Sequence, residues 1–238
     1  MLLSLLKFLI IILISFIWGI LALITIPFNR GGRVFHALTH FFAKIWLAAS
    51  RINISVKGIG NIRPGQSYIY VSNHASAFDI PAVIAGIPDQ IRIVYKKELQ
   101  KIPFFGWALK FGKTYIAIDR AKGTDAVRSL DEAAMKFKSG ASVLLFGEGT
   151  RTKDGKLQPF KRGAFNLAVK AGIPVIPLTI NGSFKILPKK KIRINPGDIT
   201  LVIEKPIPVK EGGGKEEEMR LMEEVYKVIS KNYIDQSY

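Results

Sequence analysis

The sequence contains no cysteine. Thioester chemistry through a protein thiol, disulfide bonds and cysteine-ligated zinc are therefore all excluded. It also lacks a Gly-x-Ser-x-Gly turn, the segment that holds the nucleophilic serine of α/β-hydrolases. Internal repeats and low-complexity tracts are absent as well, so the 238 residues suit one main domain with an appendage.

Acidic residues are scarce. The chain has 18 Asp plus Glu against 35 Lys plus Arg, a net charge of +17, and its first acidic residue is Asp79. Such an excess says little about the fold but indicates an anionic partner, which can be nucleic acid, a phospholipid surface or an acidic protein.

An uncharged apolar run, residues 8–28, narrows the choice of partner. As a helix it would be roughly 31 Å long, about the thickness of one hydrocarbon core. It is longer than the apolar part of a secretory signal peptide. Basic residues dominate the segment that follows, and this bias predicts the inner (cytoplasmic) membrane with the rest of the chain on the cytoplasmic side.

A second apolar stretch, residues 34–49, is shorter and contains His36, His40 and Lys44. We expect an amphipathic helix in the membrane interface, with Trp46 and the phenylalanines on its lipid side. The chain then crosses the membrane once or enters it as a two-helix hairpin that turns near residues 27–32. A buried core helix at residues 8–28 is the less favoured alternative. His36 and His40 have no acidic neighbour, so structural histidines are favoured over a metal site.

Beyond residue 51, β-rich runs alternate with helical patterns, which predicts an α/β fold with a mixed, largely parallel sheet flanked by helices. Residues 1–50 are expected to anchor the chain in the membrane and residues 51–238 to form the catalytic domain. The expected strands are 52–56, 68–72, 91–95, 114–118, 142–146, 174–180 and 199–203, and the expected helices are 81–86, 103–112, 124–138, 163–171 and 216–232.

His74 and Asp79 form the first candidate for chemistry, in a segment that follows the expected strand 68–72. Five residues along a helix would leave the two side chains roughly 140° apart, so they pair only if His74 lies in a loop and Asp79 starts the next helix. Imidazole can then act as a general base that the carboxylate orients. The alternative makes Asp79 merely an N-cap.

Two further segments suit an anionic ligand. Gly147 to Arg151 follows the strand 142–146, and its two glycines allow close approach of the backbone while Arg151 offers a planar fork for phosphate. Arg120 follows the strand 114–118 and is either a phosphate ligand or the surface partner of Asp119.

Taken in order, these segments resemble the glycerolipid acyltransferase family, in particular its 1-acylglycerol-3-phosphate acyltransferases. The resemblance covers roughly residues 50–205. The motifs that carry it are Asn73–Asp79 (Asn-His-x4-Asp), the stretch from Lys96 to Arg120, Phe146–Arg151 and Val175–Leu178. Gly147 replaces the proline that is usual in the third motif, which we expect to loosen the turn without removing a reactive group.

The resemblance implies transfer of an acyl group from an acyl carrier protein or coenzyme A thioester to the sn-2 hydroxyl of lysophosphatidic acid, giving phosphatidic acid. His74 would be the base and Asp79 would orient it. Arg120 and Arg151 would bind the phosphate with Lys96 or Lys97, while Glu148, Gly149 and Thr150 would shape the acceptor site and orient Arg151. No cofactor or metal is expected.

Three alternatives remain at this point. Ser72 and Ser76 flank His74, so a serine hydrolase is conceivable. Five cations between Lys185 and Arg193 are typical of nucleic-acid patches, but the apolar N-terminus favours an anionic phospholipid membrane, and acidic acyl carrier protein would suit the same cluster. The acceptor can also be another lysophospholipid or a lipid A precursor.

Overall fold

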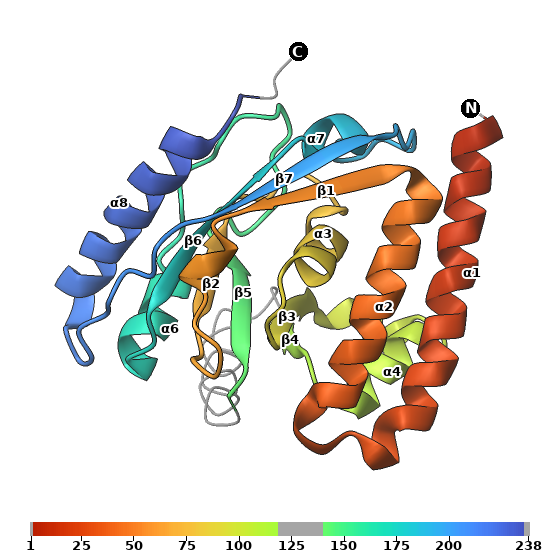
Figure 1. Cartoon of the computed structure of the whole chain (residues 1–238), viewed down its shortest axis with the longest axis horizontal. Coiled ribbons are helices and arrows are strands. Elements are labelled where there is room, and N and C mark those ends of the chain that lie inside the picture. Colours follow the sequence, from red (N-terminus) through yellow and green to blue (C-terminus); the bar gives the residue numbers. More distant parts are fainter. Residues whose placement is uncertain (1, 119–139, 236–238) are drawn as a thin grey trace.

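The computed structural model describes residues 2–118 and 140–235, in which one seven-stranded sheet lies between two layers of helices (Figure 1). The strands are β1 (Ile52–Lys57), β2 (Ile69–Ser72), β3 (Ile91–Lys96), β4 (Ile116–Ile118), β5 (Ser142–Phe146), β6 (Val175–Asn181) and β7 (Gly197–Ile203). The helices are α1 (Leu2–Thr25), α2 (Arg33–Ser50), α3 (Asp79–Gly86), α4 (Phe105–Gly112), α6 (Gly163–Ala171), α7 (Ser183–Ile186) and α8 (Gly214–Asn232).

The sheet order is β1-β7-β6-β2-β5-β3-β4. Neighbouring strands are parallel except β6 and β7, so β1 and β7 run against the other five. The predicted mixed, largely parallel sheet is confirmed. The expected helix at residues 124–138 lies outside the described residues, strand β4 is two residues shorter than expected at its start, and the short helix α7 was not predicted.

Two hydrophobic clusters fill the spaces on either side of the sheet. The larger joins one sheet face to α1–α4 and includes Trp18, Phe35, Leu47 and Ile93. The smaller joins the other face to α6 and α8 (Figure 1). Because both faces are covered, the central strands β2 and β6 are buried at every residue, as parallel strands require.

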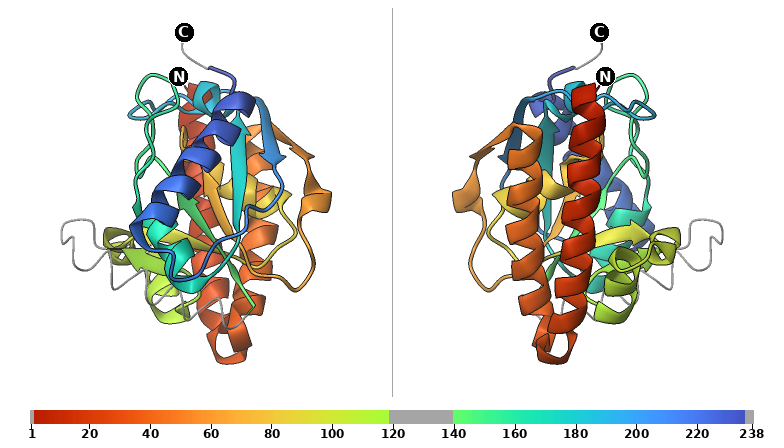
Figure 2. Two further views of the ribbon diagram at one scale, coloured as in Figure 1. Left: turned by 90° about the vertical axis from the view of Figure 1, so that its left-hand side faces the viewer. Right: turned by 90° about the vertical axis from the view of Figure 1, so that its right-hand side faces the viewer.

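The two N-terminal helices form a hairpin that turns at residues 26–32, and α1 lies between α2 and α4 (Figure 2, right view). Residues Ser4–Phe28 are the one stretch of the described chain long and apolar enough to cross a bilayer by length and composition. Lys7, Ile11, Trp18 and Ala22, spaced four, seven and four residues apart, form the buried face of α1.

The structure corrects the predicted orientation of α2. Phe35 is 1% exposed and lies in the core, and the ring of Trp46 packs on Phe78, 6.0 Å away between centroids. Phe41, at 58% exposure, does point outward as expected. Periodicity located the two faces of the helix but could not tell which one the sheet would cover.

His36 and His40 hold α2 against the following elements. A ring nitrogen of His36 lies 3.0 Å from the carbonyl oxygen of Asp89, and one of His40 lies 2.7 Å from that of Ile84. Each nitrogen must donate, because a carbonyl oxygen only accepts. Within the described residues, no group of three or more metal-binding side chains is found.

Candidate active site

The predicted site segments meet at one edge of the sheet. Strands β6, β2 and β5 are neighbours and parallel, so their carboxyl ends lie together. His74 follows β2 and the turn from Gly147 to Arg151 follows β5. The crevice beyond the carboxyl ends of parallel strands is where open α/β sheets place their ligands.

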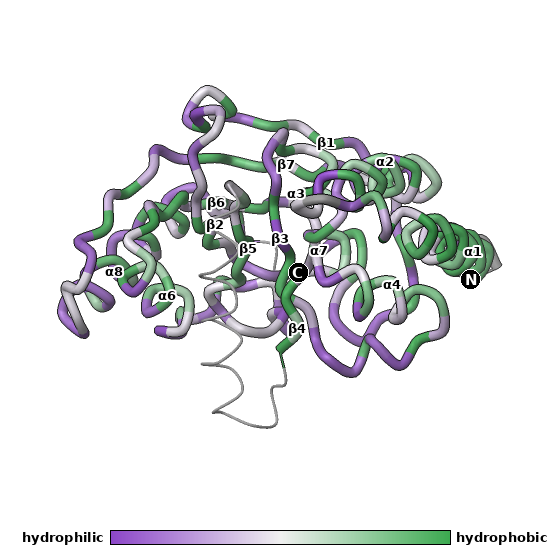
Figure 3. The backbone as a smooth tube through the Cα atoms, turned by 90° about the horizontal axis from the view of Figure 1, so that it is seen from below, coloured by the Kyte–Doolittle hydropathy of each residue, from purple (hydrophilic) through white to green (hydrophobic). Residues whose placement is uncertain are grey.

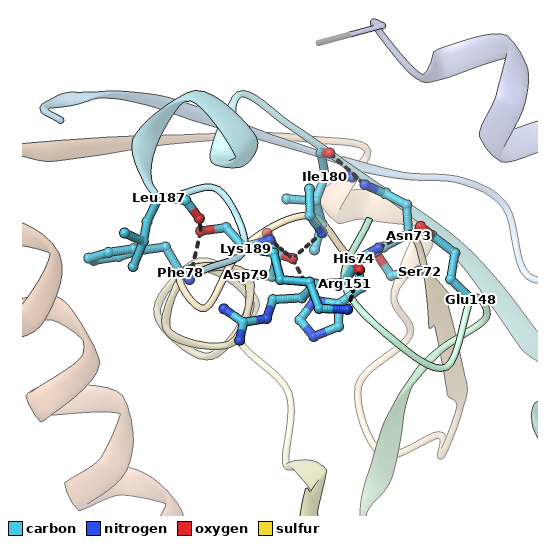
Figure 4. Close-up of polar contacts among 12 residues, drawn as sticks. Ser72, Asn73, His74, Phe78, Asp79, Glu148, Arg151, Ile180, Leu187 and Lys189 are labelled. Atoms are coloured by element: carbon cyan, nitrogen blue, oxygen red, sulfur yellow. Dashed lines mark hydrogen bonds and ion pairs between the residues drawn. The ribbon is translucent and has the colours of Figure 1, made fainter. Parts of the chain in front are cut away.

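His74 and Asp79 form a hydrogen-bonded pair (Figure 4). The imidazole Nδ1 lies 2.7 Å from Oδ2 of Asp79, whose side chain is fully buried, while the His74 side chain is 14% exposed. The Nδ1–H group donates a hydrogen bond to the carboxylate, and this tautomer leaves the Nε2 lone pair available as a base. The expected geometry, a loop histidine and an aspartate at the start of a helix, is present.

Asp79 acts as more than a helix cap. The same Oδ2 atom accepts the backbone N–H groups of Ala75 and Ser76 at 2.8 and 2.9 Å, both of which precede it in the chain. The N-cap position of α3 is occupied by Phe78. The carboxylate therefore folds the loop back around itself and fixes the imidazole at the same time.

Three more contacts hold the His74 loop. The ring stacks on Phe146 with centroids 3.7 Å apart and planes 10° from parallel. The backbone carbonyl oxygen of His74 accepts the N–H of Thr152 at 2.8 Å. The Asn73 side chain bonds both backbone groups of Ile180 on β6, at 2.8 and 2.9 Å. Asn73 belongs to the first motif, but its positioning role was not recognised from the sequence.

Glu148 contacts the histidine and not the guanidinium group. Its Oε1 accepts the His74 backbone N–H at 2.8 Å, and the side chain is buried. Burial raises the pKa of this carboxyl to about 7, the His74 N–H opposes that shift, and the nearby Asp79 charge adds to it. The resemblance predicts that Glu148 orients Arg151, whereas the described hydrogen bond of its Oε1 supports the base itself.

Lys189, from a distant part of the chain, also lies in the site. Its Nζ donates to Thr150 Oγ1 at 3.0 Å and to the carbonyl oxygen of Arg151 at 3.1 Å (Figure 4). Partial burial lowers its pKa, and so do the positive charges of Arg151, Lys153, Lys190 and Lys96. Cations from three segments therefore lie near Lys189, and two of them, Arg151 and Lys189, lie beside His74 (Figure 4), an arrangement suited to an anionic ligand.

The remaining predicted binding residues are placed as follows. Lys96 ends β3, and Lys97 begins the 3-10 helix η4 (Lys97–Lys101); both side chains are exposed. Gly149 has a φ of +72°, which favours glycine there. Arg120 lies outside the described residues.

An apolar cavity of about 150 Å³ lies between α1–α4 and the sheet. Its wall includes Trp18, Trp46, Ile80 and Pro81. The last two directly follow Asp79 on α3, so the cavity comes within one turn of helix of the histidine pair.

Neither flanking serine is placed as a nucleophile. Ser72 Oγ donates to the carbonyl oxygen of Asn73 at 3.1 Å, and Ser76 Oγ donates to that of Leu187 at 2.9 Å. Both side chains are fully buried. The hydroxyl groups stabilise the loop, so the geometry does not support a serine hydrolase.

Comparison with known proteins agrees with these motifs. The model of the acyltransferase family matches residues 53–181. The chain is 37% identical over 185 residues to a chloroplastic 1-acyl-sn-glycerol-3-phosphate acyltransferase of Brassica napus, covering 76% of this chain and 52% of the relative. It is 36% identical over 195 residues to a 1-acyl-sn-glycerol-3-phosphate acyltransferase of Pseudomonas aeruginosa, covering 79% and 74%.

The fold is also similar to a solved structure. The crystal structure of the 1-acyl-sn-glycerophosphate acyltransferase from Thermotoga maritima superposes with a TM-score of 0.81 and 29% identity, covering 98% of this chain and 93% of that one. By contrast, the chain spans about half the length of the Brassica napus relative.

Proposed function

Since this chain belongs to the acyltransferase family, we propose that it transfers a fatty acyl group from an acyl thioester to the sn-2 hydroxyl of lysophosphatidic acid, giving phosphatidic acid. The observation that carries this proposal is the 2.7 Å pair of His74 and Asp79 beside the cations of Arg151 and Lys189. Such a reaction needs a base, an anion site and an apolar cavity that lie close together in space.

In the proposed step, Nε2 of His74 removes the proton of the acceptor hydroxyl as its oxygen attacks the thioester carbonyl carbon. Asp79 stabilises the imidazolium that forms. When the tetrahedral intermediate collapses, the C–S bond breaks and the imidazolium returns its proton to the leaving thiolate. No acyl-enzyme is required, and the only other reactant is the thioester of acyl carrier protein or coenzyme A.

Arg151, Lys189 and Lys96 are the proposed ligands of the acceptor phosphate, and Arg120 remains a candidate. A guanidinium group binds two phosphate oxygens in a planar fork, and the ammonium groups act as point charges. Gly149 and Thr150 shape this side of the site, since Thr150 also binds Lys189. Lys97 remains a candidate for the same anion.

The apolar cavity is the proposed place of an acyl chain. Its lining is aliphatic and aromatic, with Ser15 and Thr39 as the few polar members, so it favours a hydrocarbon over a polar group. The apolar N-terminal helix supports a location of the site at an anionic phospholipid membrane. We propose its cytoplasmic side because the basic residues follow the apolar run.

One assay tests the proposed reaction. Purified full-length chain is supplied with lysophosphatidate and, in parallel, with acyl carrier protein or coenzyme A thioesters, and phosphatidate is measured by mass. We expect turnover with at least one donor and a loss of about 10²–10⁴ in His74→Ala, the usual contribution of a general base. His40→Gln is the matched control, because the described contact of this histidine is with a structural carbonyl oxygen and it lies on another element. Wild-type turnover in His74→Ala would end the assignment of the base.

A further inference from the structure

The segment after β3 exposes more apolar surface than a solvated turn requires. Leu99, Ile102, Trp107 and Phe111 are 36%, 44%, 41% and 54% exposed. On α4 the outward residues Trp107 and Phe111 are four apart and share one face, while Ala108 and Leu109 face the core. A clustered group of large apolar side chains at a surface indicates an interaction site.

This surface is continuous with the exposed side of α1. The ring of Phe104 lies 4.7 Å from that of Phe16 on α1 and 5.1 Å from that of Trp107 on α4. Gly19 allows the close approach, since a Cβ there would lie 2.7 Å from the Phe104 backbone. Both helices lie on one side of the molecule (Figure 2, right view), and the trace of α1 is coloured mostly hydrophobic (Figure 3). The large exposed side chains of α1 are apolar, among them Leu9, Leu13 and Phe16.

Charge around the segment has one dominant sign. Lys97, Lys101, Lys110 and Lys113 are exposed, and Glu98 is the one exposed acid between residues 96 and 113. Lysines carry their ammonium groups to the edge of an apolar surface, and tryptophan is favoured where hydrocarbon meets water. Exposed lysines of this kind are attracted to an anionic lipid surface.

We propose that η4 and α4 insert Leu99, Ile102, Trp107 and Phe111 into the headgroup region of an anionic phospholipid bilayer, as a second membrane-contacting element beside α1. The proposal rests on the proposed membrane location of the enzyme. Lipid is favoured over a protein partner by the lysine rim, the net charge of +17 and the continuity with the apolar helix. Since Lys96 precedes η4 directly, the insertion would hold that cation of the site at the level of the lipid headgroups.

Trp107 supplies a built-in reporter. Trp18 is 4% exposed and Trp46 packs on Phe78, so Trp107 is the tryptophan that the proposal places among lipids. Full-length protein is bound to phosphatidylglycerol–phosphatidylcholine vesicles that carry brominated acyl chains, and quenching is compared with Trp107→Phe. We expect the wild type to lose fluorescence and Trp107→Phe to lose most of that quenching while it still floats with the vesicles.

Equal fractional quenching of both proteins, with both floating, overturns the proposal, leaves membrane binding through α1 intact and points to a protein partner for this surface. Failure of both to float overturns it together with the membrane location. In a second measurement, Trp107→Ser with Phe111→Ser is expected to lower the vesicle partition coefficient roughly 10-fold or more. Met219→Ser is the control, since this residue is also apolar and 36% exposed but lies on α8 across the sheet. An equal loss in the control variant would contradict a specific role for α4.

Discussion

At the scale of single residues, two buried carboxylates hold the proposed base from different sides. Asp79 accepts hydrogen bonds from the His74 ring and from the backbone amides of Ala75 and Ser76. Glu148 accepts one from the backbone amide of His74. Asp79 therefore sets the tautomer and Glu148 sets the position of the main chain. The two carboxylates act on different groups, so their removal should have different consequences.

Glu148→Gln separates the charge of this residue from its hydrogen bond. The folded protein raises the pKa of Glu148 to about 7 from an ordinary value near 4.5, so it binds an extra proton between those pH values. The stability that this group contributes is then complete below about pH 4.5 and is lost as the pH rises through 7. Glutamine does not ionise, so the free energy of unfolding of Glu148→Gln should rise relative to that of the wild type between pH 5 and 8. The change should be at most about 3 kcal/mol.

Denaturant titrations of both proteins across that pH range measure the difference. Turnover should survive in Glu148→Gln, since the amide oxygen still accepts the His74 N–H. Glu148→Ala leaves this partly buried donor unpaired, at a cost of about 1–3 kcal/mol, and should lower turnover at every pH. A stability difference that does not change with pH would show that Glu148 is ionised throughout.

The sequence predicted the histidine pair because five residues of spacing admit only one local geometry. The roles of Lys189 and Glu148 could not be found in this way. Lys189 reaches Thr150 across 39 residues and Glu148 reaches His74 across 74, and such contacts depend on how the strands are ordered in the sheet. The sequence shows the cluster of cations at residues 185–193, but it does not show that Lys189 of this cluster binds Thr150 and Arg151 of the third motif.

At the scale of elements, the end of β5 shows why a glycine replaces the proline that the family resemblance leads one to expect. The N–H of Gly147 donates to the carbonyl oxygen of Ser72 at 2.8 Å, which continues the pairing of β5 with β2. The ring of Phe160 covers the glycine, so a Cβ there would lie 2.7 Å from it. The predicted loosening of this turn is therefore not what the contacts indicate, because the glycine allows both the hydrogen bond and the packing.

Gly147→Ala tests this packing. The methyl group meets the Phe160 ring and forces it to move, so we expect a loss of roughly 1–3 kcal/mol in the free energy of unfolding. Phe160→Leu in the same chain should recover part of that loss, and a double-mutant cycle measures the coupling. Gly140→Ala serves as the comparison for a glycine with open space around it, although its positive φ adds strain. Additive effects of the two changes would contradict the contact.

Element boundaries followed from the sequence where apolar runs were bounded by turn residues, as at β2, β5 and α6. They failed where tertiary contacts decide. Helix α7 has four residues and leaves no periodic pattern, and β4 keeps only the three residues that pair with β3. The outward face of α2 was also predicted wrongly at Phe35 and Trp46, since hydrophobicity alone does not distinguish lipid from protein core.

At the scale of the whole molecule, the N-terminal hairpin is part of the folded body. Trp18 packs edge-on against Phe35, 5.3 Å between centroids, and its ring is tilted against that of Phe105 at 5.2 Å. Lys7 is buried and donates to the carbonyl oxygens of Ser50 and Ile194, so it ties α1 to α2 and to the basic loop that carries Lys189. A helix held along its length in this way cannot move independently of the site.

Trp18→Ala and Leu13→Ala on the same helix distinguish a packed helix from a free-standing one. Trp18 is 4% exposed and also lines the apolar cavity, so its removal should cost about 3–5 kcal/mol of stability and alter the preferred acyl chain length. Leu13 is 57% exposed and should cost less than about 0.5 kcal/mol, since it touches little protein. Unfolding of both variants in the same detergent, followed by circular dichroism, measures the difference. A helix that merely tethers a separate catalytic domain would give two equal and small effects, because neither side chain would then contribute to the core in which α3 and the histidine pair are held.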